Sequence, residues 1–267
     1  MTTTPISEHA RTTRSRPAAV LFYYIYCEVM KLIRIPAFSI PTLLFPTMLF
    51  AFFGLPNLGA QIGGIDAGPY IMASYGAYAM MSVALFSFGV SIAAERGLGW
   101  NKLLRTMPLN PLVYFMAKTG MALIFGVLTL LPLFAFAGIV GGVSLGLLAW
   151  SRLIGLLVVG MIPFVALGLW LGYFGGPNSA PAIANVIYLP LSFASGLLMP
   201  LEFLPPVVRA IAPYLPAYHV GQLAWTSLGA GDGASLGSHL LWLAGYTALF
   251  LVMALVAYRR DEGKTYG

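Results

Sequence analysis

Residues 153–174 read LIGLLVVGMIPFVALGLWLGYF, and the chain stays free of charged side chains as far as residue 201. A helix needs about 20 mostly apolar residues to cross the ~30 Å hydrocarbon core of a bilayer. The uncharged run is therefore long enough for two crossings, divided by the turn-forming residues 175–181, GGPNSAP. It predicts an integral membrane protein.

The composition of the whole chain agrees with this prediction. Of its 267 residues, 59% are hydrophobic and 8% are charged, whereas soluble domains carry about 25% charged residues. The net charge of +6 comes from too few side chains to form a surface that tracks nucleic-acid phosphates, so no nucleic-acid partner is expected. The single cysteine, Cys27, excludes an internal disulfide framework and a paired-cysteine metal site.

The uncharged runs between ionisable residues predict six spans, with limits of 37–56, 71–94, 115–138, 153–174, 182–201 and 238–258. The uncharged interval 210–231 is broken by Pro213 and Pro216, which favours a segment inserted only part-way. The expected fold class is all-α: six transmembrane helices, an N-terminal interfacial amphipathic helix and a broken re-entrant segment between spans five and six. The span interiors hold essentially no ionisable residue, which argues against a proton-coupled transporter or a voltage sensor.

The distribution of Lys and Arg predicts the orientation. With the N-terminus placed in the cytoplasm, all but two of the 14 basic residues lie on the cytoplasmic side, and only Arg152 and Arg209 lie outside. An even number of spans returns the C-terminal tail, residues 259–267, to the cytoplasm. We therefore expect a multi-pass protein of the cytoplasmic membrane with both termini inside.

The N-terminal region predicts a disordered tail over residues 1–17 and an interfacial helix over residues 18–34. Glu28, Lys31 and Arg34 recur every three residues, so they lie on one side of this helix, where Glu28 and Lys31 can pair. Such a helix would lie in the membrane interface. The alternative, a signal anchor, is disfavoured by the short apolar run and the missing cleavage site.

The segment between spans two and three, residues 95–112, reads ERGLGWNKLLRTMPLNPL. It places apolar and basic side chains on a short helix that Pro108 and Pro111 end. One interpretation is an ordinary interfacial loop that follows the positive-inside rule. The other is a docking element, which passes motion from a cytoplasmic partner to the bundle.

The segment after span five, residues 195–216, reads SGLLMPLEFLPPVVRAIAPYLP. Its prolines predict two short helical pieces that dip back into the outer half of the membrane. Glu202 and Arg209 are seven residues apart and would share a helix face. One interpretation is an extracellular loop with snorkelling charges; the other is an outer gate.

No motif predicts catalysis or a metal site. Gly263-Lys264-Thr265 resembles the end of a phosphate-binding loop, but the pattern requires glycine at position 258, where Tyr258 stands. The three histidines, His9, His219 and His239, are too scattered in the sequence to predict a metal site. We therefore expect no enzyme activity and no cofactor on this chain.

Taken in order, these features resemble the type 2 ATP-binding cassette (ABC) export permeases over almost the whole chain. The likeness consists of an interfacial elbow helix, six spans, an E-R-G…L-L-R-x-x-P-L loop at residues 95–109, and an S-G…P…L-P…P pattern. The last pattern lies at Ser195, Gly196, Pro200, Leu204, Pro205, and Pro213 or Pro216.

The resemblance implies a single six-span transmembrane domain over residues 18–258. It also implies a dimer with a second copy or a similar permease, and a separate ABC-type subunit that binds ATP and Mg. By this likeness the ATPase-docking residues are Glu95, Arg96, Trp100, Lys102, Leu103, Leu104 and Arg105. The outer re-entrant region is residues 201–218, with gate residues Pro200, Glu202, Pro205, Arg209 and Pro213.

The expected function is ATP-driven export of an apolar or amphipathic substrate, such as a drug, an antibiotic or a lipid-like molecule, because the predicted spans are uncharged. Membrane lipid is the expected surrounding partner. Two alternatives remain open: a non-transporting membrane scaffold or assembly protein, and an ATP-independent carrier.

Overall fold

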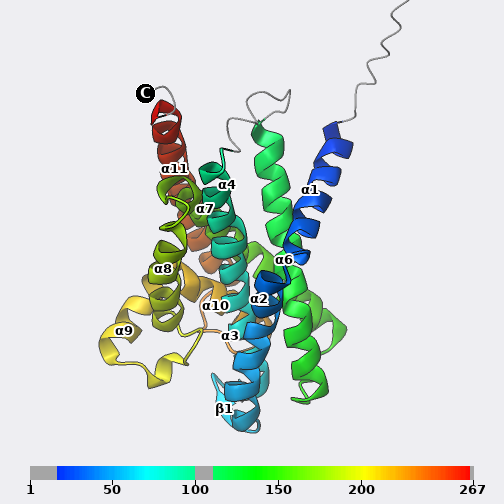
Figure 1. Cartoon of the computed structure of the whole chain (residues 1–267). Coiled ribbons are helices and arrows are strands. Elements are labelled where there is room, and N and C mark those ends of the chain that lie inside the picture. The colour runs from blue at the N-terminus through cyan, green and yellow to red at the C-terminus, as the bar shows by residue number, and fades with distance from the viewer. Residues whose placement is uncertain (1–16, 100–110, 265–267) are drawn as a thin grey trace, which may run out of the picture.

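The computed structural model describes residues 17–99 and 111–264 and shows helices that stand side by side in a bundle (Figure 1). Five of the described helices are long and apolar enough to cross a membrane: Pro36–Asn57, Ala67–Gly97, Leu112–Ile139, Leu147–Phe174 and Leu236–Asp261. A further apolar helix, Ala180–Ala194, is shorter. The predicted all-helical membrane protein is confirmed, with five long apolar helices and one short one.

The first half of the bundle is built from segments that continue one another. Helix α1 (Pro17–Ile33) is followed by α2 (Pro36–Leu49), the π-helical turn η1 (Phe50–Gly54), the 3-10 turn η2 (Leu55–Asn57) and an antiparallel hairpin of β1 (Gln61–Ile62) and β2 (Ile65–Asp66). Helix α3 (Ala67–Ser82), the π-helix η3 (Val83–Val90) and α4 (Ser91–Gly97) then form one continuous span.

The second half begins with two long helices, α6 (Pro111–Ile139) and α7 (Leu147–Phe174), and continues with α8 (Ala180–Ala194). Short pieces follow: the 3-10 turn η4 (Leu201–Phe203), α9 (Pro206–Ile211) and the 3-10 turn η5 (Ala212–Tyr214). Helix α10 (Pro216–Ser227) and the long α11 (Leu236–Lys264) complete the described chain.

The range 18–34, predicted to form the interfacial elbow helix, is helical: α1 runs one residue earlier, from Pro17 to Ile33. Its aromatic side chains Phe22, Tyr23 and Tyr26 are exposed, whereas Val29 and Leu32, nearer the end of the helix, are buried. The helix packs mainly against α6. Its position in the membrane interface stays a prediction.

The fifth predicted span, 182–201, is too long, because α8 ends at Ala194. Gly196 then adopts a φ of 82°, a left-handed conformation that stops the helix and that glycine accepts without a steric penalty. At 1.5 Å per residue, the 15 residues of α8 extend about 22 Å, which is less than the ~30 Å hydrocarbon core. Helix α8 alone is therefore too short to cross a bilayer.

The predicted break between spans five and six is present, but its limits differ from residues 201–218. After η5, helix α10 runs unbroken to Ser227 and packs against α3, α7 and α11. Trp225 holds it there, because its ring stacks on Tyr70 with centroids 4.9 Å apart and its Nε1 donates to Ser74 Oγ at 2.8 Å. With 12 residues, α10 is a buried helix that is too short to span the membrane, and its re-entrant position stays a prediction.

The expectation that Glu202 and Arg209 share one helix face is wrong. Glu202 lies in η4 and Arg209 lies in α9, and Leu204 between them is extended, with φ −91° and ψ 152°. Pro205 and Pro206 interrupt the helix at this point, because proline lacks the amide hydrogen and disfavours helical geometry in the residue before it.

The core is tightest where α7 crosses η3. A Cβ added to Gly168 would lie 2.3 Å from the Ala84 carbonyl oxygen, and one added to Gly89 would lie 2.7 Å from the Gly168 carbonyl oxygen. Gly172 lies as close to Ile92. Small residues allow this backbone approach, so Gly168 and Gly172 form a packing surface of α7.

The beginning of α1 and the end of α11 lie at the same end of the bundle, and the hairpin with β1 lies at the other end (Figure 1). This arrangement is the one expected for a protein whose two tails are on one side of the membrane. The side on which they lie stays a prediction.

Candidate functional site

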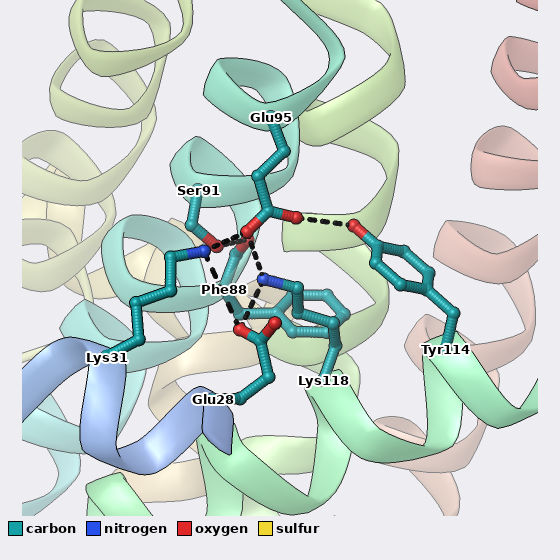
Figure 2. Close-up of polar contacts among 7 residues, drawn as sticks. All are labelled: Glu28, Lys31, Phe88, Ser91, Glu95, Tyr114 and Lys118. Atoms are coloured by element: carbon teal, nitrogen blue, oxygen red, sulfur yellow. Dashed lines mark hydrogen bonds and ion pairs between the residues drawn. The ribbon is translucent and has the colours of Figure 1, made fainter. Parts of the chain in front are cut away.

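A buried ionic cluster joins three helices near the end of the bundle where α1 begins and α11 ends. Its members are Glu28 and Lys31 on α1, Glu95 on α4, and Tyr114 and Lys118 on α6. Lys118 Nζ lies 2.6 Å from Glu28 Oε2 and 2.6 Å from Glu95 Oε1, and Figure 2 shows it between the two carboxylates. Lys31 is ion-paired with Glu95, and the Tyr114 hydroxyl donates to Glu95 Oε2 at 2.8 Å.

The charges of this cluster balance in a place with little water. Lys118 is fully buried, and Glu28 and Glu95 are each less than a tenth exposed. Two carboxylates and two ammonium groups leave no net charge. Such a network costs desolvation energy to form, but removing one partner leaves an uncompensated buried charge, which costs about 3–5 kcal/mol.

Lys31 occupies the exposed edge of the cluster, where it also lies 3.8 Å from Glu28 Oε2, as the spacing on α1 predicted. Burial alone would lower the pKa of Lys31. The hydrogen bond and the negative charge of Glu95, together with the charge of Glu28, outweigh that effect and raise the pKa above its ordinary value. Lys31 therefore stays charged and compensates the second carboxylate.

The expectation that the span interiors contain no ionisable residue is wrong for Lys118. This lysine lies inside the predicted range 115–138 and is buried against α1 and α4. The sequence held a signal, because an ionisable residue within a span normally has a partner. What the sequence lacked was the information that α1 folds back along α6 and supplies Glu28.

The neighbouring residue, Arg96, binds a different part of the bundle. Its Nε donates to Asp261 Oδ2 on α11 at 3.1 Å, and its Nη2 pairs with the other oxygen of the same carboxylate. Its Nη1 donates to the Gly172 carbonyl near the end of α7. The guanidinium carbon also lies 5.1 Å from the centre of the Tyr173 ring. This bidentate pairing with a carboxylate is a geometry that arginine provides and lysine does not.

Only two of the predicted docking residues lie in the described part of the chain, Glu95 and Arg96. Both side chains contact other helices of the same chain. The other five, Trp100, Lys102, Leu103, Leu104 and Arg105, lie outside the described residues. Docking of an ATPase by any of the seven stays a prediction.

The predicted gate residues all lie in the stretch of short pieces between α8 and α10. Pro200 and Pro205 directly precede η4 and α9, and Pro213 lies within η5. The side chains of Glu202 and Arg209 are exposed. Their role as a gate stays a prediction.

The structure also brings together three side chains that the sequence analysis did not connect. His219 on α10 and His239 on α11 are both buried, and their Nδ1 atoms are 3.0 Å apart. His239 Nε2 lies 3.3 Å from Asp232 Oδ1 in the intervening loop. No helical or strand spacing links positions 219, 232 and 239, so tertiary packing alone makes the contact.

Comparison with known proteins agrees with this architecture. A family model described as "ABC-2 family transporter protein" matches residues 61–256. The chain belongs to the ABC-2 transporter family. The match covers the bundle from the β-hairpin to the last long helix, and the resemblance inferred from the loop and proline motifs is thereby confirmed.

Two relatives of this ABC-2 permease differ in how much of their length the chain covers. The putative transport permease YvfS of Bacillus subtilis is 27% identical over 236 residues, which are 88% of this chain and 95% of that protein. The inner membrane transport permease YhhJ of Escherichia coli is 28% identical over 223 residues, which are 78% of this chain but 54% of that protein. The chain thus spans about half the length of the second relative.

Membership of the family makes this chain an ABC-2 permease, the membrane subunit of a transporter, and implies an ATP-binding partner subunit. Permeases of this family typically lack an ATPase domain. Within the described residues, no group of three or more His, Cys, Asp or Glu side chains is placed to hold a metal ion. The two histidines and Asp232 form a chain of contacts and do not converge on one point.

Proposed function

We propose that this ABC-2 permease is the membrane-spanning half of an ATP-driven exporter in the inner membrane. It moves an apolar or amphipathic substrate outward, and a separate subunit hydrolyses ATP. The inner-membrane location follows the relative YhhJ. The nature of the substrate follows the five long helices, whose apolar character offers little to a charged molecule.

The observation that carries this proposal is that two consecutive residues of α4 bind different sets of helices. Glu95 ties the end of this helix to α1 and α6, and Arg96 ties it to α7 and α11. The segment that follows, with Leu103, Leu104 and Arg105, docks on the ATPase. A displacement of α4 by that partner is passed to four helices at once, because ion pairs and charged hydrogen bonds connect α4 to all of them.

At the opposite end of the bundle, the short pieces between α8 and α10 form the exit gate. Rigid helices transmit a rocking motion, whereas a chain of brief helical turns joined by prolines changes shape between them. Helix α10 is anchored through Trp225, so the mobile part of the gate is Pro200 to Pro213.

The permease works as a pair with a second copy or a similar subunit. The spans Pro36–Asn57 and Leu236–Asp261 bury the smallest shares of their apolar windows, 22% and 17%. Apolar side chains on these spans, such as Phe52 and Leu241, are exposed. In the membrane these faces meet lipid and the second permease.

Co-purification from the native membrane in mild detergent tests the coupled assembly. We expect an ATPase with a phosphate-binding loop to accompany the tagged permease in equal amount. Changing Leu103, Leu104 and Arg105 to alanine should remove it, whereas Arg259→Ala and Arg260→Ala, two exposed basic residues of α11, should not.

Transport is then measured in vesicles that contain the purified assembly, with an amphipathic fluorescent dye as the probe. ATP should stimulate dye movement by at least about tenfold. Dye movement that is independent of nucleotide indicates a carrier, and a stable bundle that moves no dye and binds no ATPase indicates a scaffold. Either result overturns the exporter proposal.

A further inference from the structure

The buried pair His219 and His239 lies in the half of the bundle away from the chain termini. His239 is in the first turn of α11, which runs from that half towards the C-terminus, and His219 is in the first turn of α10. The two rings are 3% and 2% exposed. Two buried histidines in contact are costly unless each ring nitrogen has a hydrogen-bond partner.

The hydrogen bonds decide where the protons are. Asp232 is a carboxylate, because the Tyr218 hydroxyl donates to Oδ2 at 2.8 Å and the Ala234 amide donates to Oδ1 at 2.9 Å. Partial burial would raise its pKa, but these hydrogen bonds and the nearby His239 lower it. An ionised carboxylate only accepts, so His239 Nε2 carries the hydrogen in this contact.

The rest of the assignment follows from that first hydrogen. In a neutral ring with Nε2 protonated, His239 Nδ1 is an acceptor. His219 Nδ1, 3.0 Å away, must therefore be the donor. This leaves His219 Nε2 as a bare lone pair in the neutral pair of rings.

That last nitrogen is buried and has no hydrogen-bond partner. The carbonyl of Pro213 lies near enough to the His219 ring to favour its protonated form. Trp242 covers one face of the ring, with ring centroids 5.2 Å apart and planes 14° apart. A proton added to the unpartnered Nε2 would turn this nitrogen into a donor, for which the Pro213 carbonyl is the nearby acceptor.

We propose that His219 and His239 form a binding site for one proton, with Asp232 as its counter-charge, and that the bound proton fastens the turn at Pro213 to α10 and α11. The proton adds to His219 Nε2, which then donates to the Pro213 carbonyl. The His219–His239 and His239–Asp232 hydrogen bonds keep their direction. A second proton is excluded, because it would place two N–H groups against each other across 3.0 Å.

The groups around His219 determine the pH range in which the site binds its proton. Burial, and then the neighbouring His239 ring, lower the pKa of His219 to about 4, so the site is empty at neutral pH and fills in acid. Among the described side chains, the elements packed against α10 carry these titratable or charged groups: Tyr70, Tyr75 and Tyr78 on α3, Arg152 and Tyr173 on α7, Tyr214 on η5, and Tyr246, Tyr258, Arg259, Arg260 and Asp261 on α11. Among the described residues, Asp232 is the carboxylate in direct contact with the pair.

This proton site goes beyond the proposed function, because its geometry does not depend on which substrate the permease moves. Only its location on the outer side of the membrane depends on the proposed orientation. There, the permease would sense external acidity through the turn that contains the predicted gate residue Pro213.

Trp242 supplies a direct readout, because a protonated imidazole stacked on indole quenches its fluorescence. The full-length permease in detergent is titrated from pH 8 to about pH 3.5, and the signal of Trp242→Phe is subtracted. We expect a reversible quench that fits one proton, with a midpoint below the ordinary histidine value of about 6.5. His219→Gln should abolish it. Asp232→Asn should move the midpoint to lower pH by about 1 unit or more, because the counter-charge is lost.

The same titration can overturn the proposal. A Trp242-dependent quench that survives in His219→Gln, or its absence from the wild-type protein, rules out the proton site. Asp232→Asn lies outside the helices and keeps both rings, so it remains informative even where His219→Gln fails to fold. An unchanged midpoint in that variant removes Asp232 from the site.

Discussion

Glu95 and Arg96 are consecutive in the chain, yet their side chains bind different helices: Glu95 contacts Lys31 and Lys118, and Arg96 contacts Asp261. The short helix α4 is thereby fixed to α1 and α6 on one side and to α11 on the other, at the end of the span Ala67–Gly97. In the function proposed above, Glu95 and Arg96 transmit the motion of the ATPase to these helices, and the predicted docking residues Trp100 to Arg105 bind it.

Lys118→Met should destabilise the permease strongly. The change keeps most of the side-chain volume but leaves Glu28 and Glu95 without their shared buried cation, at a cost of about 3–5 kcal/mol. A clear fall in melting temperature in detergent is expected, and adding Glu28→Gln should restore part of it. Arg260→Met, on an exposed residue, is the control. A melting temperature equal to that of the control would contradict the buried cluster.

Arg96→Gln should reduce transport without preventing the ATPase from binding. We expect the ATPase partner still to co-purify, while ATP-stimulated transport falls by about tenfold, or ~1.4 kcal/mol of lost coupling. Asp261→Asn should give a similar loss, and the double variant should lose little more, since both changes break one contact. Loss of the ATPase itself from Arg96→Gln would instead indicate a direct docking contact.

Gly168→Ala should disrupt the crossing of α7 and η3. The new methyl group would meet the Ala84 carbonyl oxygen at 2.3 Å, and the backbone must shift to admit it. Overpacking of this kind costs about 1–3 kcal/mol. Gly155→Ala, on the same helix with nothing within 4 Å of its Cβ position, is the matched control and should be neutral or slightly stabilising. Equal melting temperatures for the two variants would disprove the close approach.

Acid should weaken the fold through His219. Its pKa is lowered from 6.5 to about 4 in the folded protein, so between these values the unfolded chain binds the proton and the folded chain does not. The stability contributed by the neutral ring is therefore complete above about pH 6.5 and is lost as the pH falls towards 4. Melting temperatures measured across this range should fall less steeply in His219→Gln than in wild type. Parallel curves would exclude this source of the pH dependence.

Reporter fusions test the orientation. Fusions before residue 17 and after residue 264 should both report the cytoplasm, because all but two basic residues were assigned to that side. A fusion in the loop between β1 and β2 should report the outside. A tail found outside the cell would overturn the predicted topology.

Much of the fold could be predicted because hydropathy is a local property. The long helices, the elbow helix and the break after span five follow from apolar runs, from the spacing of Glu28 and Lys31, and from prolines. The limits of α8 and α10 could not be predicted in the same way. Gly196 ends α8 through a left-handed turn, and Trp225 fixes the place of α10 in the bundle through its stack on Tyr70; neither effect appears in hydropathy.

The sequence by itself determined that this is a helical membrane protein, and its loop and proline motifs pointed to the family. Bilayer thickness and the cost of unpaired backbone groups permit few other outcomes for such apolar runs. Only the tertiary structure decided which charges meet. Lys118 has its partners 90 residues before it and 23 residues before it, and His219 has its partner 20 residues after it. Buried polar groups must find partners wherever the packing brings them, and the packing depends on side-chain shape across the whole bundle.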